Sequence, residues 1–325
     1  MAHMTNPLAT VDQLYRRTSS FGALPSDLQD AIFFATQSLT QAAGLLLRLP
    51  QSVTAQASVV LARYWLEDSL LANEFGDVSA ASLFLVAKLG AHPCRPRDVC
   101  NVYAYLLSPA SSLLRPEPSS PSSLPAPNPS SYYLSESTYA AFRTRILRLE
   151  SRILYTLGFD THVALPHGLA VTYLQALDFC GDPSRAKITR RVVAYLNSAL
   201  LSPQMLYLTH QPNALAVAAI YSAARDAEIS AKMPECPWWE VFDVDREELG
   251  FLVVGMRSLE GLVRKLQGDF KGFNKTGMIT KNDIDAEMAR RGLKLTNGAD
   301  AGTGEMDEEE LMMRSLDDKA ERMVE

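Results

Sequence analysis

Two segments of this chain carry the same pattern, although they begin 137 residues apart, at Ser79 and Ala216. Each is apolar or small at nearly every position and closes on a single basic residue, Lys88 in the first and Arg225 in the second. A helix without a polar face is surrounded by other helices on all sides. The repeat therefore predicts two consecutive helical bundles, each built around its own central helix.

Helical spacing recurs on both sides of the first central segment, and strand alternation does not. Besides that segment, the first half contains predicted helices at 28–46, 53–66, 97–107 and 139–157. Ser26 or Asp27 is expected to cap the first of them, and Ser135 or Ser137 the last. Five helices are thus predicted between residues 26 and 158, with the buried one third in order.

The second half repeats this count around the second central segment. Its predicted helices lie at 166–179, 188–200, 212–226, 237–242 and 245–266. The predicted fold class is therefore all-α, with two consecutive five-helix bundles. The expected domains are an N-terminal extension at 1–25, a first bundle at 26–158, a second bundle at 159–267 and a polar, acidic, disordered tail at 268–325.

One stretch of the first bundle has a different composition. Residues 108–131 hold seven prolines and nine serines in 24 positions. Such a segment cannot bury enough apolar surface to offset the entropy lost when it becomes ordered. We therefore expect a disordered insertion between the fourth and fifth helices of this bundle.

Composition and motifs argue against several classes of function. The net charge of −6 and the pI near 5.5 disfavour a protein that coats nucleic acid or an anionic membrane. No apolar run approaches the ~20 residues that span a bilayer. The chain contains no glycine-rich nucleotide loop and no metalloprotease or serine-hydrolase motif, and its four cysteines lack the spacing of zinc sites. These observations predict a helical binding module without catalytic residues, cofactor or metal.

An ordered series of local motifs resembles cyclin L. The stretches that carry it are Gln41–Gln51 (QAAGLLLRLPQ), Arg95–Val102 (RPRDVCNV), Glu150–Phe159, His162-Val163, Pro166-His167, Tyr173–Gln175, Ile220–Arg225 and Pro237–Trp239. They follow one another in a consistent order over roughly residues 26–267. The resemblance implies a double cyclin fold, in which each five-helix bundle is a cyclin box, and it favours cyclin L over other transcriptional cyclins.

The resemblance also implies a function. It is that of a non-catalytic regulatory subunit in a heterodimer with a cyclin-dependent kinase, and the expected kinase is cyclin-dependent kinase 11. The expected setting is the nucleus, in pre-mRNA splicing and in transcription by RNA polymerase II. Splicing-associated proteins are expected as further partners, whereas membranes and direct nucleic-acid contacts are not.

Two residues match the polar pair with which cyclins hold the kinase helix that carries the catalytic glutamate. They are Lys88, at the end of the third predicted helix, and Glu150, on the fifth. An ammonium donates to backbone carbonyls and a carboxylate accepts from backbone amides, and charge strengthens both bonds. Because a buried unpaired charge is costly, both side chains are expected to be at least partly solvent-accessible in the free protein. Arg225, the counterpart of Lys88 in the second box, is expected to take no part in this contact.

The sequence also departs from the cyclin pattern. Cyclins usually follow that lysine with a hydrophobic residue and two glutamates, but here Leu89 is followed by glycine, alanine and histidine. Ala62 stands where many cyclins have an aspartate. Taken without the resemblance, Lys88 is a cation that complements a helix dipole and Glu150 is a solvated position on a long helix. Two other functions stay open: a cyclin T-, K- or C-like partner of another transcriptional kinase, and a transcription scaffold of the TFIIB type that binds no kinase.

Overall fold

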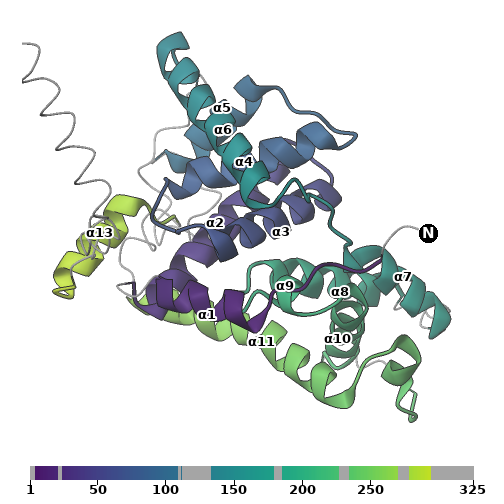
Figure 1. Ribbon diagram of the computed structural model, residues 1–325. Helices are drawn as coiled ribbons and strands as arrows, with labels where there is room; N and C mark the ends of the chain where they lie inside the picture. Colours follow the sequence, from purple (N-terminus) through teal and green to yellow (C-terminus); the bar gives the residue numbers. More distant parts are fainter. Residues whose placement is uncertain are drawn as a thin grey trace, which may run out of the picture. The chain divides into compact units, whose positions relative to one another are not determined.

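A computed structural model describes residues 4–20, 24–108, 111, 133–178, 185–226, 234–269 and 278–293. Throughout this described part the regular secondary structure is helical and contains no strand (Figure 1). None of the described helices combines the length and the apolar character needed to cross a membrane. The chain divides into two compact units, residues 1–284 and 285–325, and the first contains both bundles. The predicted all-α fold of two consecutive bundles is confirmed.

The first bundle has the five predicted helices. They are α2 (Ser26–Leu46), α3 (Gln51–Glu67), α4 (Phe75–Leu89), α5 (Pro96–Leu107) and α6 (Glu136–Thr156). The third of them, α4, packs against each of the other four (Figure 1). Almost all of the predicted insertion at 108–131 lies outside the described residues.

The centre of the first bundle is α4, in which every residue from Phe75 to Ala87 is buried. Alanine and serine recur along this stretch and Gly76 lies near its start, so neighbouring helices can approach its backbone closely. Three buried hydroxyls are linked through Ser79, whose Oγ lies 2.7 Å from Thr40 Oγ1 on α2 and 2.7 Å from the Tyr103 hydroxyl on α5. Each hydroxyl therefore has a hydrogen-bond partner in an interior where an unpaired one would be costly.

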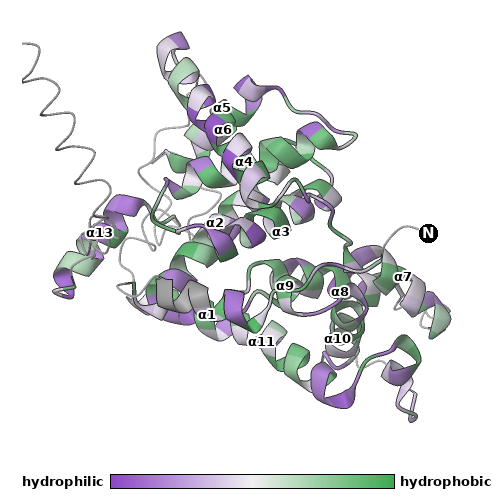
Figure 2. Ribbon diagram, in the orientation of Figure 1, coloured by the Kyte–Doolittle hydropathy of each residue, from purple (hydrophilic) through white to green (hydrophobic). Residues whose placement is uncertain are grey.

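The second bundle repeats this plan. Its helices are α7 (Pro166–Ala176), α8 (Arg185–Leu200), α10 (Pro212–Ala224), the 3₁₀ helix η2 (Trp238–Phe242) and α11 (Arg246–Asp269). The central helix α10 is buried from Ala214 to Ala224 except at Tyr221, as the repeat predicted. Figure 2 shows hydrophilic and hydrophobic residues alternating along α11, as expected for a helix with one side on a core. A short helix, α9 (Leu206–Thr209), was not predicted, because four residues are too few to show a period.

An arginine on α3 holds the connection between the bundles. Arg63 is only 8% exposed, and its Nη1 donates a hydrogen bond of 2.7 Å to the carbonyl of His162. Burial lowers the pKa of this guanidinium, and the nearby carboxylate of Asp160 counteracts part of that effect. The connection is therefore fixed to the first bundle by a buried cation.

The N-terminal extension ties the two bundles together a second time. Asn6 is 4% exposed. Its side chain donates to the carbonyl of Ala164 at 2.8 Å and accepts from the amide of the same residue at 2.7 Å. Its backbone exchanges two further hydrogen bonds with the side chain of Gln211. The extension continues into α1 (Val11–Ser20), which packs on α3.

Beyond α11 the structure differs from the expected disordered tail. A helix, α13 (Lys281–Arg290), lies within it. Met278 and Ile284 are buried, and Lys281 Nζ donates to the carbonyl of Leu71 at 2.7 Å. Sequence spacing missed this helix because its apolar residues are few and stand among polar ones. The tail from residue 294 onward lies outside the described residues.

The predicted cap is right for α6 and wrong for α2. Ser135 precedes α6, and its hydroxyl accepts the N–H of Thr138 at 3.3 Å. At α2, Pro25 holds the cap position without a side-chain hydrogen bond, and Ser26 and Asp27 lie inside the helix. The proline ring fixes φ, here at −54°, and so replaces a side-chain cap as the element that directs the chain into the helix.

At Gly44, α2 packs closely against Thr54 of α3, and a substitution there tests the packing. A Cβ at Gly44 would lie 2.2 Å from Oγ1 of buried Thr54. Gly44→Ala should therefore lower the free energy of unfolding by about 1–3 kcal/mol through overpacking, measured as a lower Tm. Gly168→Ala on α7 is the matched control, because no heavy atom lies within 4 Å of its Cβ position. It should keep or raise the Tm, since alanine favours a helix over glycine; equal losses in both variants would contradict the close approach.

Candidate functional site

The structure brings Lys88 and Glu150 together. Lys88 lies in the last turn of α4 and Glu150 lies on α6, and these two helices pack side by side (Figure 1). Lys88 Nζ is 2.9 Å from Glu150 Oε1, which makes a hydrogen-bonded ion pair. The two residues are therefore one unit before any partner is present.

The expected exposure is right for Lys88 and wrong for Glu150. The side chain of Lys88 is 57% exposed, whereas that of Glu150 is 7% exposed. On α6, Glu150 follows buried Leu149 and lies one turn before buried Ile153, so its stem is drawn into the packed surface. A buried carboxylate without a partner would be costly, but the exposed ammonium of Lys88 reaches this one from the solvent side.

This pair retains capacity for further hydrogen bonds. An ammonium has three donors, and Lys88 uses one of them on Glu150. The Lys88 ammonium also lies 5.9 Å from the centre of the Phe84 ring, at the edge of the range for a cation–π contact. The exposed ammonium can therefore donate to a backbone carbonyl of another protein without leaving Glu150.

Two arginines that sequence analysis did not identify fix α6 beside its neighbours. Arg145 Nε is 2.7 Å from Oδ2 of Asp77 on α4, and Arg152 Nε is 2.6 Å from Oδ2 of Asp68, which follows α3. Both carboxylates are largely buried, at 10% and 14% side-chain exposure. The phenol of Tyr64 donates to the same Asp68, and its pKa is raised by burial first and by this bond second. Glu150 lies between the two arginines, so they set the position of its helix.

Exposed apolar residues accompany the pair. Leu89, directly after Lys88, is 59% exposed. At the end of α6, Tyr155 and Phe159 are 74% and 61% exposed and form an edge-to-face pair with ring centres 5.4 Å apart. Phe159 has a left-handed backbone with φ of 63°, which directs the chain away from the helix axis. Large exposed aromatic rings are typical of protein–protein interfaces. Both residues belong to the Glu150–Phe159 stretch that carries the cyclin resemblance, but their exposure is visible only in the structure.

The counterpart in the second bundle is arranged differently. Arg225 follows α10, is exposed, and donates to the Tyr221 hydroxyl at 2.9 Å. Within the described part of the chain it has no carboxylate partner. The acidic residue here is Asp226, which binds Arg191 on α8 and the Tyr195 hydroxyl. A basic residue thus ends the central helix in both bundles. Lys88 forms an ion pair with the last helix of its bundle, whereas Arg225 donates to a residue of its own helix.

Among the described residues, no group of three or more His, Cys, Asp or Glu side chains is placed to hold a metal ion. Three of the four cysteines, Cys94, Cys100 and Cys236, are free thiols. The arrangement around Lys88 is a partly exposed polar pair with apolar neighbours, which is suited to docking another protein.

Comparison with proteins of known sequence finds cyclins. The chain is 31% identical to human cyclin-L2 over 247 residues, and 30% identical to the Caenorhabditis elegans cyclin L homolog cyl-1 over 261 residues. These alignments cover 76% and 77% of this chain but only 43% and 50% of the two relatives. Human cyclin-L1 is 32% identical over 212 residues, which cover 65% of this chain and 36% of that protein. The chain thus spans half or less of the length of these relatives. No family model matches it.

Comparison with solved structures finds the same fold in kinase complexes. A chain in the crystal structure of the yeast RNA Pol II CTD kinase CTDK-1 complex superposes with a TM-score of 0.59, covering 89% of this chain and 84% of that one. A chain in the CAK complex of Chaetomium thermophilum bound to ATP-gamma-S gives 0.57, with 93% of each chain covered. At 14% and 13% identity, these likenesses show the fold alone.

The dependence of buried Glu150 on exposed Lys88 can be measured as a change in the free energy of unfolding when either residue is substituted. Lys88→Met should lower the free energy of unfolding by about 1–3 kcal/mol, because it leaves a buried carboxylate without its donor. Glu150→Gln should cost less, because the amide oxygen still accepts from Lys88. Chemical denaturation of both single variants and the double variant gives the coupling energy. The exposed pair Arg264–Glu260 is the control, and Arg264→Ala should stay within about 0.5 kcal/mol of the parent. A Lys88→Met effect no larger than this control would contradict the inferred dependence of Glu150 on Lys88.

Proposed function

Because the chain is cyclin L-like over about three quarters of its length, we propose that it binds and activates a cyclin-dependent kinase as its regulatory subunit. The observation that supports this most directly is the preformed Lys88–Glu150 pair, at 2.9 Å, beside exposed Leu89. The two residues are those that the cyclin resemblance assigns to kinase contact. Their present geometry suits that role, since one member is exposed and the other is fixed in the surface.

In the proposed complex, the first bundle packs against the kinase helix that carries the catalytic glutamate. Lys88 donates to backbone carbonyls of the kinase, while the free lone pairs of Glu150 accept from backbone amides. Inward movement of the kinase helix completes the lysine–glutamate pair that a kinase needs for phosphoryl transfer. The chain itself supplies no catalytic group, only the surface that favours the active arrangement.

The aromatic pair at the end of α6 extends this surface. Tyr155 lies on α6 five residues after Glu150, which corresponds to roughly 7.5 Å along the helix axis, and Phe159 packs against it just beyond the helix end. Apolar contacts there supply the area that a polar pair alone lacks, since the buried centre of an interface is usually apolar. We assign kinase recognition to a first cyclin box at 26–158, and a supporting role to a second box at 159–267.

We further propose a kinase of the cyclin-dependent kinase 11 type as the catalytic partner, with the heterodimer acting in the nucleus in pre-mRNA splicing and transcription. The support for the kinase type is the series of relatives named cyclin L. The support for transcription includes the fold shared with a chain of a kinase complex whose name specifies the RNA polymerase II tail. Splicing-associated proteins are proposed as further partners.

Kinase binding tests the role of the pair. Lys88→Ala and Glu150→Ala should each weaken binding to the cognate kinase by about 2–5 kcal/mol in calorimetry, because truncation leaves charged or polar groups unpaired in the interface. Arg225→Ala, at the equivalent place in the second box, is the matched control and should bind like the parent. Glu150→Gln separates folding from binding, since it keeps an acceptor for Lys88 but loses the charge. If Arg225→Ala weakened binding as much as Lys88→Ala, the first box would not be the activating surface.

Activation tests the proposed kinase type. The purified chain is mixed in turn with the catalytic subunit of cyclin-dependent kinase 11 and with those of other transcriptional cyclin-dependent kinases, and phosphorylation of a splicing-factor peptide and of a polymerase-tail peptide is measured. We expect the kinase 11 subunit to gain the most activity, and Lys88→Ala to reduce that gain. Activation of another kinase but not of kinase 11 would preserve the cyclin function and refute the partner. Activation of none would refute the function.

A further inference from the structure

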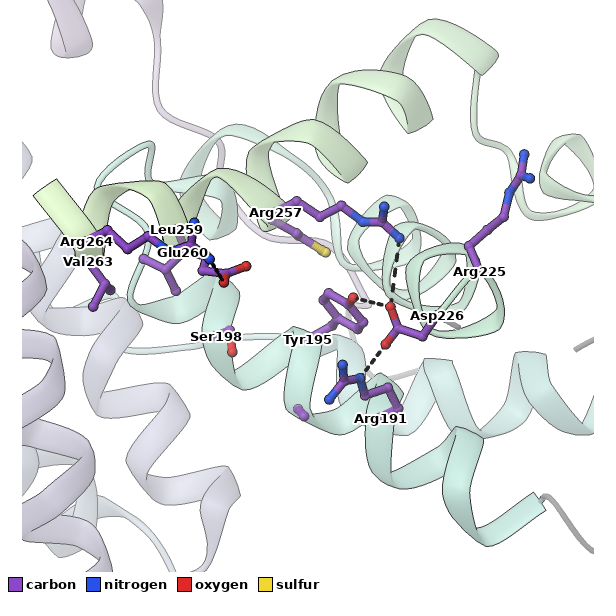
Figure 3. Close-up of a pocket in the computed structure, with 12 residues that line it drawn as sticks. Arg191, Tyr195, Ser198, Arg225, Asp226, Arg257, Leu259, Glu260, Val263 and Arg264 are labelled. Carbon is purple, nitrogen blue, oxygen red and sulfur yellow. Dashed lines mark hydrogen bonds and ion pairs between the residues drawn. The ribbon is translucent and has the colours of Figure 1, made fainter. Parts of the chain in front are cut away.

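The second bundle contains a pocket that the kinase proposal does not use. It lies between α8 and α11 and is closed at one end by the residues that follow α10 (Figure 3). Its volume is about 680 Å³. Tyr195 and Ser198 of α8 line one wall, and Arg257 and Val263 of α11 line the opposite wall.

This pocket is basic in a chain that is acidic. Four arginines line it but only two carboxylates, whereas the chain as a whole has a net charge of −6. The arginines are Arg191, Arg225, Arg257 and Arg264. Arg264 is paired with Glu260, at 2.5 Å, at one end of the pocket. The excess positive charge therefore lies at the other end, around Asp226.

At that end, part of the guanidinium capacity is unused. Asp226 accepts from Arg191 and, at 2.7 Å, from the Tyr195 hydroxyl. Arg257 Nη2 is 3.9 Å from Asp226, a distance at which charges attract but no hydrogen bond forms. Among the described residues, Arg257 has no hydrogen-bond acceptor, and its side chain is 49% exposed (Figure 3). Its donors are thus directed into the pocket and available.

The internal repeat allows the end of the pocket around Asp226 to be compared with the Lys88–Glu150 pair of the first bundle. In the first bundle, the end of the central helix carries a cation, Lys88, and the last helix carries the carboxylate of Glu150. In the second bundle, the end of the central helix carries Arg225 followed by Asp226, and the last helix carries Arg257. This edge of the second bundle therefore has more cations than carboxylates, and a partner that contributes negative charge would complement it.

We propose that this pocket binds a phosphorylated serine or threonine in a segment of a partner protein. A phosphate carries about two negative charges and three strong acceptor oxygens, and the planar fork of arginine matches it with two parallel hydrogen bonds. Arg257 supplies such a fork, and Arg191 and Arg225 add positive charge beside it. Asp226 orients Arg191, and the phosphate enters on the side of Arg257.

The dimensions and the charge favour a phosphorylated peptide over a nucleic acid. A single open pocket of this size takes one phosphate and its flanking residues, whereas a nucleic-acid strand needs a basic groove that follows many phosphates. The overall acidic charge opposes such a strand. The site belongs to the second bundle alone, so it holds whether or not the first bundle binds a kinase.

The test uses the purified full chain and a degenerate peptide mixture on beads, with a central phosphoserine between random residues. Matched mixtures carry serine or aspartate at the centre. We expect roughly tenfold more protein on the phosphoserine beads than on the serine beads, and loss of the difference at high salt. Arg257→Ala should bring retention down to the serine level. Arg246→Ala is the control, because Arg246 is exposed on the same helix but does not line the pocket.

Folding is checked by circular dichroism for each variant. If Arg257→Ala does not fold, Arg257→Lys replaces it, and retention should then be intermediate because the charge stays and the fork is lost. Equal retention on phosphoserine and serine beads would overturn the proposal, as would equal effects of Arg246→Ala and Arg257→Ala. If the protein were retained on aspartate beads as well as on phosphoserine beads, phosphate recognition would be overturned. If short single-stranded RNA displaced the protein from the phosphoserine beads at equal concentration, the pocket would be a nucleic-acid site instead.

Discussion

The fold depends on one central helix in each bundle, α4 and α10, that is buried on every side. Such a helix must let four neighbours approach, and it must leave no polar group unpaired. Along α4 the first requirement is met by small residues and the second by Ser79, which shares hydrogen bonds with Thr40 and Tyr103. Once α4 is fixed in this way, its last turn has a defined place at the edge of the bundle, and with it Lys88. The position of the site is thus a consequence of the packing of the core.

Three ion pairs then fix the position of the outer helix α6 against its neighbours. Three carboxylates, those of Asp68, Asp77 and Glu150, have side chains at most 14% exposed, and each is met by a cation that is about half exposed. Exposed cations lose little hydration, while each buried carboxylate gains a charged donor. This division keeps α6 in register without enclosing a whole ion pair. It also leaves Lys88 with free donors at the surface.

The features that could be predicted from the sequence are those that leave a pattern within one helix. Burial on all sides excludes polar residues, so both central helices leave a visible pattern, and Lys88 was found because it ends one of them. The burial of Glu150 could not be read, because it depends on how α6 is rotated against α4. The arginine pocket was missed for a similar reason, since Arg191, Asp226 and Arg257 come from three separate segments. The short helix α9 and the sparse helix α13 carry too few apolar residues to show a period.

The four hydrogen bonds of Asn6 have a mechanical consequence. They connect the chain's first residues to the start of the second bundle and to the residue before α10, while α1 rests on α3 of the first. The extension is thus hydrogen-bonded to the second bundle at Asn6 and packed on the first bundle through α1, so a hinge motion between the bundles would have to break one of these two attachments. A force on one bundle is therefore transmitted to the other through the N-terminal extension. For the same reason we expect the two bundles to unfold cooperatively.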